Sequence, residues 1–170
     1  FREGGEDKRP ILGGKGAGLA EMTRIGLTVP PGFTITTEAC KIYYESGQKL
    51  PESLEEDIVK HMKGLEEETG KCFGGDHKPL LVSVRSGAPI SMPGMMDTIL
   101  NLGLNDRSVM GLYEATQDLR FSYDCYRRFI QMFGNVVLDI PHHEFEAAFS
   151  ELKKSEGVTQ DQDVSAEGLK

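Results

Sequence analysis

The sequence has few cysteines, no excess of positive charge and no long apolar run, and each shortage excludes a class of protein. Its three cysteines, Cys40, Cys72 and Cys125, are odd in number and widely spaced, which argues against a disulfide framework or a zinc site. The 27 acidic residues outnumber the 19 basic ones, so we expect no nucleic acid partner. No run approaches the roughly 18 apolar residues of a membrane span. We expect a soluble intracellular chain, in the cytoplasm or in a plastid or other organelle.

The chain of 170 residues, 38% of them hydrophobic, is long enough for one core, or for one lobe with a smaller lobe appended. Residues 1–104 alternate short apolar runs with glycine-rich turns, whereas residues 105–170 show helical spacing. This change of sequence pattern predicts an α/β (α+β) lobe over residues 1–104 and a mainly helical subdomain over residues 105–170, truncated at its C-terminal end. From Ser155 onward we expect no regular structure.

Glycine and proline divide the first region into elements. We predict a loop over Gly13–Gly18 and then a short helix that ends at Gly26. An interrupted strand is expected over Val29–Ile35. The apolar run Leu80–Val84 predicts a buried strand.

A helix is expected where Leu54, Ile58 and Met62 recur at helical spacing. We predict a capping box formed by Ser53 and Glu56 at its start, and a stop at Gly70.

The segment from Leu12 to Gly18 places one cation, Lys15, among four glycines just before the predicted helix. Glycine lets backbone N–H groups approach an oxyanion, and a helix N-terminus adds partial positive charge. Lys15 is therefore a candidate phosphate ligand, although the spacing matches neither a P-loop nor a dinucleotide fingerprint. The alternative is a flexible turn with a solvated lysine.

A second candidate, Arg85, ends the predicted buried strand and is followed by small residues. An arginine can clamp a phosphate with two parallel hydrogen bonds, and ligands collect at strand carboxyl ends in open α/β sheets. The alternative is a structural arginine paired with an acidic neighbour.

The third candidate is a methionine-rich segment around Pro93 and Gly94. It predicts a flexible apolar flap, suited to covering a planar base or to excluding water from phosphates, in which Gly94 allows close backbone approach. The weaker candidates in the same segment are Ser91, Met92, Met95, Asp97 and Thr98. Plain core packing of the methionines is the alternative.

Together and in this order, the motifs resemble those of the pyruvate, phosphate dikinase family. The resemblance is carried by Leu12–Met22, Val29–Phe33, Thr36–Cys40, Leu80–Gly87, Ser91–Asp106 and Tyr123–Phe129. Phosphoenolpyruvate synthase and rifampin phosphotransferase share the domain, but their flap resembles Ser-Phe-Ala-Gly-Gln-Gln-Asp-Thr, whereas this chain has Ser-Met-Pro-Gly-Met-Met-Asp-Thr.

The resemblance implies the first lobe of an ATP-grasp-like nucleotide-binding domain with an appended helical subdomain. ATP and inorganic phosphate would react there, and a phosphoryl group would pass to a histidine on a separate swivelling domain and then to pyruvate. The products would be AMP, diphosphate and phosphoenolpyruvate. Lys15 and Arg85 would bind phosphate, with the Gly94 loop over the polyphosphate. Mg²⁺ would accompany ATP, with its ligands, the acceptor histidine and the pyruvate site beyond Lys170.

The chain is accordingly expected to be a fragment of a longer, homo-oligomeric parent and inactive alone, with no certain catalytic residue and no metal ligand of its own. Three other interpretations stay open. The parent could resemble phosphoenolpyruvate synthase, the chain could be a non-catalytic ATP-binding module, or it could be a plain structural domain in which Lys15 and Arg85 form internal ion pairs.

Overall fold

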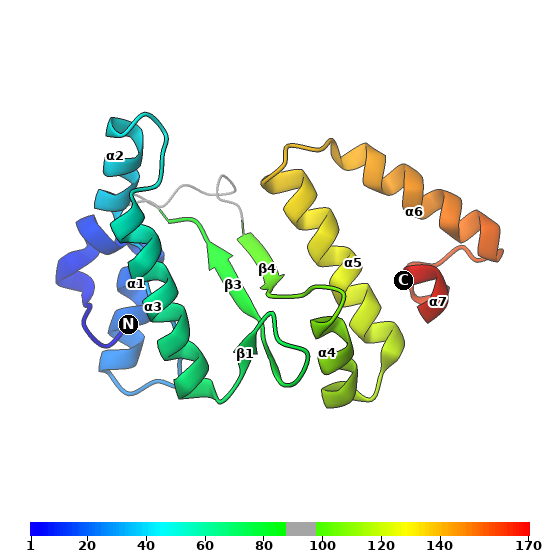
Figure 1. The fold of residues 1–170 in the computed structure, drawn as a ribbon, viewed down its shortest axis with the longest axis horizontal. Coiled ribbons are helices and arrows are strands. Elements are labelled where there is room, and N and C mark those ends of the chain that lie inside the picture. Colours follow the sequence, from blue (N-terminus) through cyan, green and yellow to red (C-terminus); the bar gives the residue numbers. More distant parts are fainter. Residues whose placement is uncertain (88–97) are drawn as a thin grey trace. The chain divides into compact units, whose positions relative to one another are not determined.

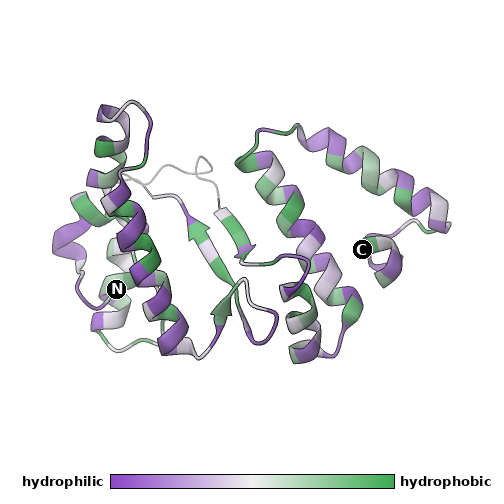
Figure 2. Ribbon diagram, viewed as in Figure 1, coloured by the Kyte–Doolittle hydropathy of each residue, from purple (hydrophilic) through white to green (hydrophobic). Residues whose placement is uncertain are grey.

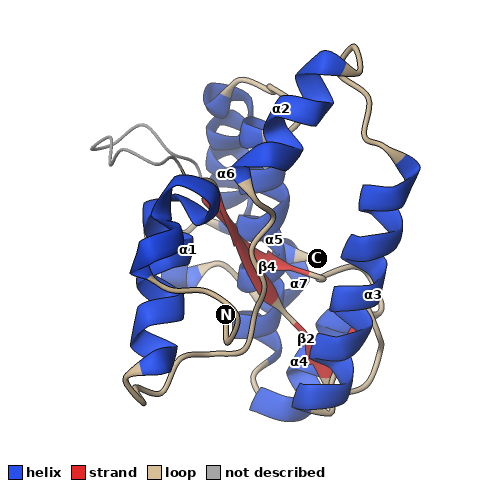
Figure 3. Ribbon diagram, turned by 90° about the vertical axis from the view of Figure 1, so that its left-hand side faces the viewer, coloured by secondary structure: helices blue, strands red, loops and turns tan. Residues whose placement is uncertain are grey.

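The computed structural model describes residues 1–87 and 98–170, which form two compact units (Figure 1). Of the described residues, unit 1 holds 1–70 and 85–87, and unit 2 holds 71–84 and 98–170. Both α-helices and β-strands occur, and helices dominate, as Figure 3 shows in blue. The mixed fold class is confirmed, whereas the division into an α/β lobe and a helical subdomain at residue 104 stays a prediction. None of the described helices is both long and apolar enough to span a membrane.

Unit 1 is helical. Its elements are the 3-10 helix η1 (Glu6–Lys8) and the α-helices α1 (Arg9–Arg24), α2 (Thr37–Glu45) and α3 (Glu52–Thr69). Its buried apolar residues are small or few: Ala17 is fully buried, and Ala20, Ala39 and Leu65 are each less than one tenth exposed. Close approach of backbones therefore contributes much of the packing in this unit.

The predicted loop over Gly13–Gly18 is wrong, because only Gly13 leaves the helical conformation. Its φ of 69° and ψ of 169° break α1 into two helical parts, in a backbone region essentially open to glycine alone. Residues 14–18 are helical because Gly16 and Ala17 bury their backbone in unit 1. The predicted stop at Gly26 is confirmed: its φ is 83°, and the amide of Leu27 donates to the carbonyl oxygen of Met22 at 3.0 Å, as in a Schellman motif.

Two further predictions for unit 1 need correction. Residues 27–36 form no strand, since Pro30 and Pro31 have no N–H group to donate to a ladder. The capping box is also wrong, because α3 begins at Glu52 after Pro51 and Ser53 already lies inside the helix. The predicted stop is confirmed, with Gly70 in the left-handed conformation at φ 64°.

Unit 2 begins with two small sheets. Strand β1 (Cys72–Phe73) pairs in parallel with β2 (Pro79–Leu80), and β3 (Val82–Arg85) pairs with β4 (Thr98–Leu102), antiparallel in Figure 1. The predicted strand over residues 80–84 is thus divided between β2 and β3. It is also less buried than predicted, since the Val84 side chain is 47% exposed. Among the described residues β3 has a single partner strand, so much of its surface lies open.

Four α-helices follow the sheets. They are α4 (Ser108–Thr116), α5 (Leu119–Val136), α6 (His142–Glu156) and α7 (Ala166–Leu169), with the 3-10 helix η2 (Asp161–Asp163) before the last. Figure 2 shows hydrophobic and hydrophilic residues interleaved along α5, which packs against β4, α4, α6 and α7. It is the central helix of this unit.

The C-terminal segment is ordered, contrary to the sequence-based expectation. Val164 is fully buried and Leu169 is 9% exposed. Arg120 on α5 donates from Nε to the carbonyl oxygen of Val164 at 2.9 Å and from Nη2 to that of Asp161 at 2.6 Å. Two separated apolar side chains and one arginine therefore hold a segment that lacks apolar periodicity.

Candidate phosphate-binding site

The structure brings Lys15 to the residue that follows Arg85. Lys15 lies in the first turn of α1 after the break at Gly13, with its side chain exposed. Its Nζ donates a hydrogen bond of 2.7 Å to the main-chain carbonyl oxygen of Ser86. Both residues belong to unit 1. Two of the three sequence motifs singled out for phosphate binding thus meet at one place.

The break at Gly13 has an electrostatic consequence. A helix that begins anew after Gly13 leaves the N–H groups of its first turn without partners inside the helix. These groups carry partial positive charge, and the ammonium of Lys15 lies in the same turn. The place where α1 restarts is therefore suited to an anion.

Arg85 is the last residue of β3, and its side chain is exposed. Among the described residues no carboxylate forms an ion pair with Arg85 or with Lys15, whose hydrogen-bond acceptor is a neutral carbonyl group. The positive charges of Lys15 and Arg85 therefore lie on two segments that are in contact, although the net charge of the chain is −8.

Most of the predicted flap lies outside the described residues. This holds for Gly94 and for the weaker candidates Ser91, Met92, Met95 and Asp97. Thr98 is described, and it begins β4 as a half-buried residue of unit 2. Its role as a phosphate ligand stays a prediction.

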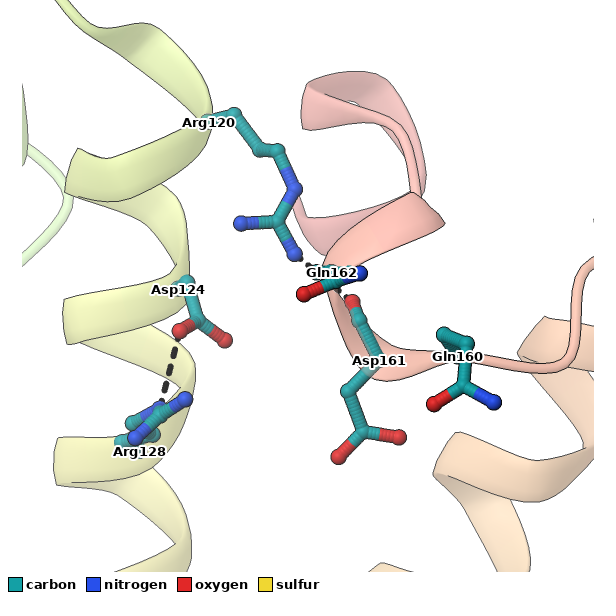
Figure 4. A pocket seen from close by; sticks show the side chains of 6 residues that line it. All are labelled: Arg120, Asp124, Arg128, Gln160, Asp161 and Gln162. Carbon is teal, nitrogen blue, oxygen red and sulfur yellow. Dashed lines mark hydrogen bonds and ion pairs between the residues drawn. The ribbon is translucent and has the colours of Figure 1, made fainter.

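A polar hollow of about 370 Å³ in unit 2 was not predicted from the sequence. It is lined by Arg120, Asp124, Arg128, Gln160, Asp161 and Gln162 (Figure 4). Arg128 donates from Nε to Asp124 Oδ2 at 2.8 Å, and Lys153 holds the pKa of Asp161 below its ordinary value through a 2.7 Å hydrogen bond. The i, i+4 spacing of Asp124 and Arg128 is the one signal in the sequence for this cluster.

The neighbouring hollow, of about 550 Å³, has an aromatic wall. The guanidinium of Arg127 lies 4.2 Å from the ring centre of Phe149, and Lys153 Nζ lies 5.3 Å from the same centre. Arg127 also pairs with Asp124 at 2.8 Å, and both side chains are less than one fifth exposed. The cations that line these two hollows are thus already engaged by carboxylates, carbonyl groups or an aromatic ring.

The described residues do not supply a metal centre. Within residues 1–87 and 98–170, no three His, Cys, Asp or Glu side chains gather where they could hold a metal ion. His77 pairs with Glu114 at 3.0 Å and His142 with Glu146 at 3.2 Å, so each of these histidines has a single carboxylate partner.

Comparison with known proteins gives one consistent answer. A family model described as the pyruvate phosphate dikinase AMP/ATP-binding domain matches residues 9–50. The chain is 53% identical over 99% of its length to pyruvate, phosphate dikinase 2 of Zea mays. It is 55% identical over 99% to chloroplastic pyruvate, phosphate dikinase 1 of Arabidopsis thaliana and 52% identical over 100% to pyruvate, phosphate dikinase of Clostridium symbiosum. It spans 19%, 17% and 20% of these relatives' own lengths, respectively.

Proposed function

Because the chain corresponds along its whole length to a segment of pyruvate, phosphate dikinase sequence, we propose that it binds the phosphates of ATP at Lys15 and Arg85. It does so as part of a longer parent enzyme. The relatives are about five times as long as this chain, so the complete reaction requires residues that this segment does not contain.

The single observation that carries the proposal is the 2.7 Å hydrogen bond from Lys15 Nζ to the carbonyl oxygen of Ser86. It places an ammonium group against the segment that carries Arg85. A phosphate that replaced the Ser86 carbonyl as acceptor would exchange a neutral partner for a charged one, and such hydrogen bonds are roughly twice as strong. The absence of a competing carboxylate among the described residues leaves both cations available for it.

The two cations have different tasks in this proposal. The Lys15 ammonium is a compact charge on a flexible stem and can follow a phosphate as it moves. The Arg85 guanidinium is planar and offers two parallel N–H groups, which fix the orientation of a phosphate. Together with the backbone N–H groups after Gly13, they would stabilise the negative charge of the polyphosphate.

In the parent enzyme, the proposed reaction converts ATP, inorganic phosphate and pyruvate to AMP, diphosphate and phosphoenolpyruvate. A histidine on a separate swivelling domain carries the phosphoryl group between the nucleotide and pyruvate. The fold we propose for this segment is the first lobe of an ATP-grasp-like domain, in a homo-oligomeric parent. The positioned cations stabilise charge on the phosphoryl group that is transferred, which is the main way in which proteins assist such reactions.

Magnesium would enter with ATP. The described residues contain no group of three or more His, Cys, Asp or Glu side chains that could hold a metal ion, and Mg²⁺ bound with a nucleotide takes many of its oxygen ligands from phosphates and water. No step assigned to Lys15 or Arg85 depends on the ion.

Calorimetric titration with MgATP and with MgAMP tests the proposal. Wild-type chain should bind MgATP more tightly than MgAMP, and Lys15→Ala and Arg85→Ala should each weaken MgATP binding about tenfold, the effect of losing one hydrogen bond to a charged group. Binding of MgAMP should change little. Equal MgATP affinity in wild type and both variants would overturn the assignment of these residues.

Lys8→Ala is the matched control. Lys8 is exposed in unit 1 and, like Lys15, donates to a main-chain carbonyl oxygen, that of Glu3 at 2.9 Å. Lys8→Ala removes the same charge and the same kind of hydrogen bond as Lys15→Ala, but at a different place. MgATP affinity should therefore stay at the wild-type value.

A further inference from the structure

The residue after Lys15 is closely packed against another part of the chain. A Cβ atom added at Gly16 would lie 3.0 Å from Thr34 Cγ2, 3.1 Å from Thr34 Oγ1 and 3.3 Å from Leu12 Cβ. Carbon atoms in favourable contact are separated by about 3.5–4.0 Å. Thr34 therefore occupies the space beside Gly16 in which a side chain would otherwise lie.

Thr34 is itself held in place from both sides. Two residues before it, Gly32 lies under the ring of Phe1, whose Cζ would be 2.7 Å from an added Cβ. Three residues after it, Thr37 Oγ1 donates to the carbonyl oxygen of Pro10 at the start of α1 with a distance of 3.0 Å. The segment of Thr34 is thus fixed on α1 although it forms no strand or helix.

Gly18, in the same motif, lacks this constraint. A Cβ at Gly18 would meet no atom within 4 Å among the described residues. Gly13 serves the different purpose of breaking the helix, with its φ of 69°. Gly16, unlike Gly18, is therefore a glycine of this motif whose missing side chain admits a neighbour from another part of the chain.

We propose that Thr34 and Gly16 are positioning residues for Lys15. Their contact fixes the position and rotation of the first helical turn after the break at Gly13, so that Lys15 Nζ reaches the carbonyl oxygen of Ser86. The contact is steric and does not touch a ligand. Its functional meaning rests on the proposed binding of ATP phosphates, since a displacement of the turn would move the ammonium away from the segment that carries Arg85.

The test uses Gly16→Ala, the double variant Gly16→Ala with Thr34→Ala, and Gly18→Ala as matched control. The first readout is the nuclear Overhauser effect between the Lys15 ε-methylene protons and Ser86, and the second is MgATP affinity. Gly16→Ala should lose the Overhauser effect and weaken MgATP binding about tenfold, as expected if the Lys15 ammonium no longer reaches its partner. The double variant removes both Thr34 atoms that an added methyl would meet and leaves only the 3.3 Å approach to Leu12 Cβ, so it should recover most of both signals.

Gly18→Ala should leave both readouts at wild-type values, because the added methyl group meets no described atom within 4 Å. Retention of the Overhauser effect in Gly16→Ala, or failure of Thr34→Ala to restore it, would overturn the positioning role. If Gly16→Ala does not fold, the single variant Thr34→Ala tests the proposal instead. Loss of the contact between Thr34 and Gly16 should weaken the Overhauser effect, and an unchanged effect would contradict the proposal.

The two readouts separate this inference from the proposed function. Loss and recovery of the Overhauser effect without any MgATP binding by the wild type would support the positioning pair and contradict ATP binding. MgATP binding that is equal in all four proteins would contradict the positioning pair and leave ATP binding in place.

Discussion

Lys15 Nζ donates a hydrogen bond of 2.7 Å to the main-chain carbonyl oxygen of Ser86, 71 residues further along the sequence. The contact joins the restart of α1 to the segment that follows β3. It brings together two motifs that the sequence presents far apart, and both carry a cation. The proposed phosphate site follows from this meeting and from the charges of the two side chains.

The shape of the arginine side chain should matter as much as its charge. Arg85→Lys keeps the charge but loses the planar pair of N–H groups. We expect MgATP affinity to fall several-fold, with a smaller loss than in Arg85→Ala, as measured by calorimetry. Arg107→Lys, a change of the same type at an exposed residue of unit 2, should have no effect. Full affinity in Arg85→Lys would show that Arg85 contributes charge alone.

Gly103 should be intolerant of any side chain. Its φ is 114°, and an added Cβ would lie 2.6 Å from the carbonyl oxygen of Leu80. Gly103→Ala should therefore lower the free energy of unfolding by about 3 kcal/mol, measured by urea denaturation. Gly64→Ala lies inside α3, where an added methyl meets no described atom within 4 Å, and it should raise stability by about 0.5–1 kcal/mol. Equal effects of the two changes would contradict this account.

The contact between His77 and Glu114 should depend on pH. Glu114 accepts a hydrogen bond of 3.0 Å from His77 and, with the charges of Glu114 and Asp76, raises the pKa of His77 above its ordinary value of 6.5. A raised pKa in the folded state means that the contact stabilises fully below the ordinary value and is lost as pH rises through the folded pKa. NMR titration should show the midpoint of His77 falling in Glu114→Gln. An unchanged midpoint would show that Glu114 is not the cause.

Arg120 should control the C-terminal segment. Arg120→Ala removes the hydrogen bonds to the carbonyl oxygens of Val164 and Asp161, which we expect to cost about 2 kcal/mol. Hydrogen exchange should show lost protection over residues 161–169 and little change in unit 1. Protection equal to wild type would mean that burial of Val164 alone holds the segment.

Local sequence signals predicted much of the helical structure. The helix ends at Gly26 and Gly70 were predictable because the left-handed conformation after a helix is a local preference of glycine. It needs no contact with residues far along the sequence. Lys15 and Arg85 could likewise be chosen as candidates because glycine-rich and strand-end contexts are visible in the sequence.

The remaining features depend on residues far apart in the sequence. Residues 14–18 form a helix because Gly16 and Ala17 are buried against neighbours such as Thr34, and no local pattern encodes that contact. The order of the C-terminal segment depends in the same way on Arg120, 44 residues before Val164. The two hollows of unit 2 combine side chains of α5, α6 and the segment around Asp161, a combination that only the folded chain shows.

The most direct test of the central claim is a map of amide chemical shifts in the 15N-labelled chain during titration with MgATP. We expect the largest changes on Gly14, Lys15 and Gly16 and on Ser86 and Gly87, and we expect these changes to vanish in Lys15→Ala. Changes confined to Arg120, Asp124 and Arg128, with the Lys15 turn unaffected, would place the nucleotide in the polar hollow of unit 2 and contradict the account.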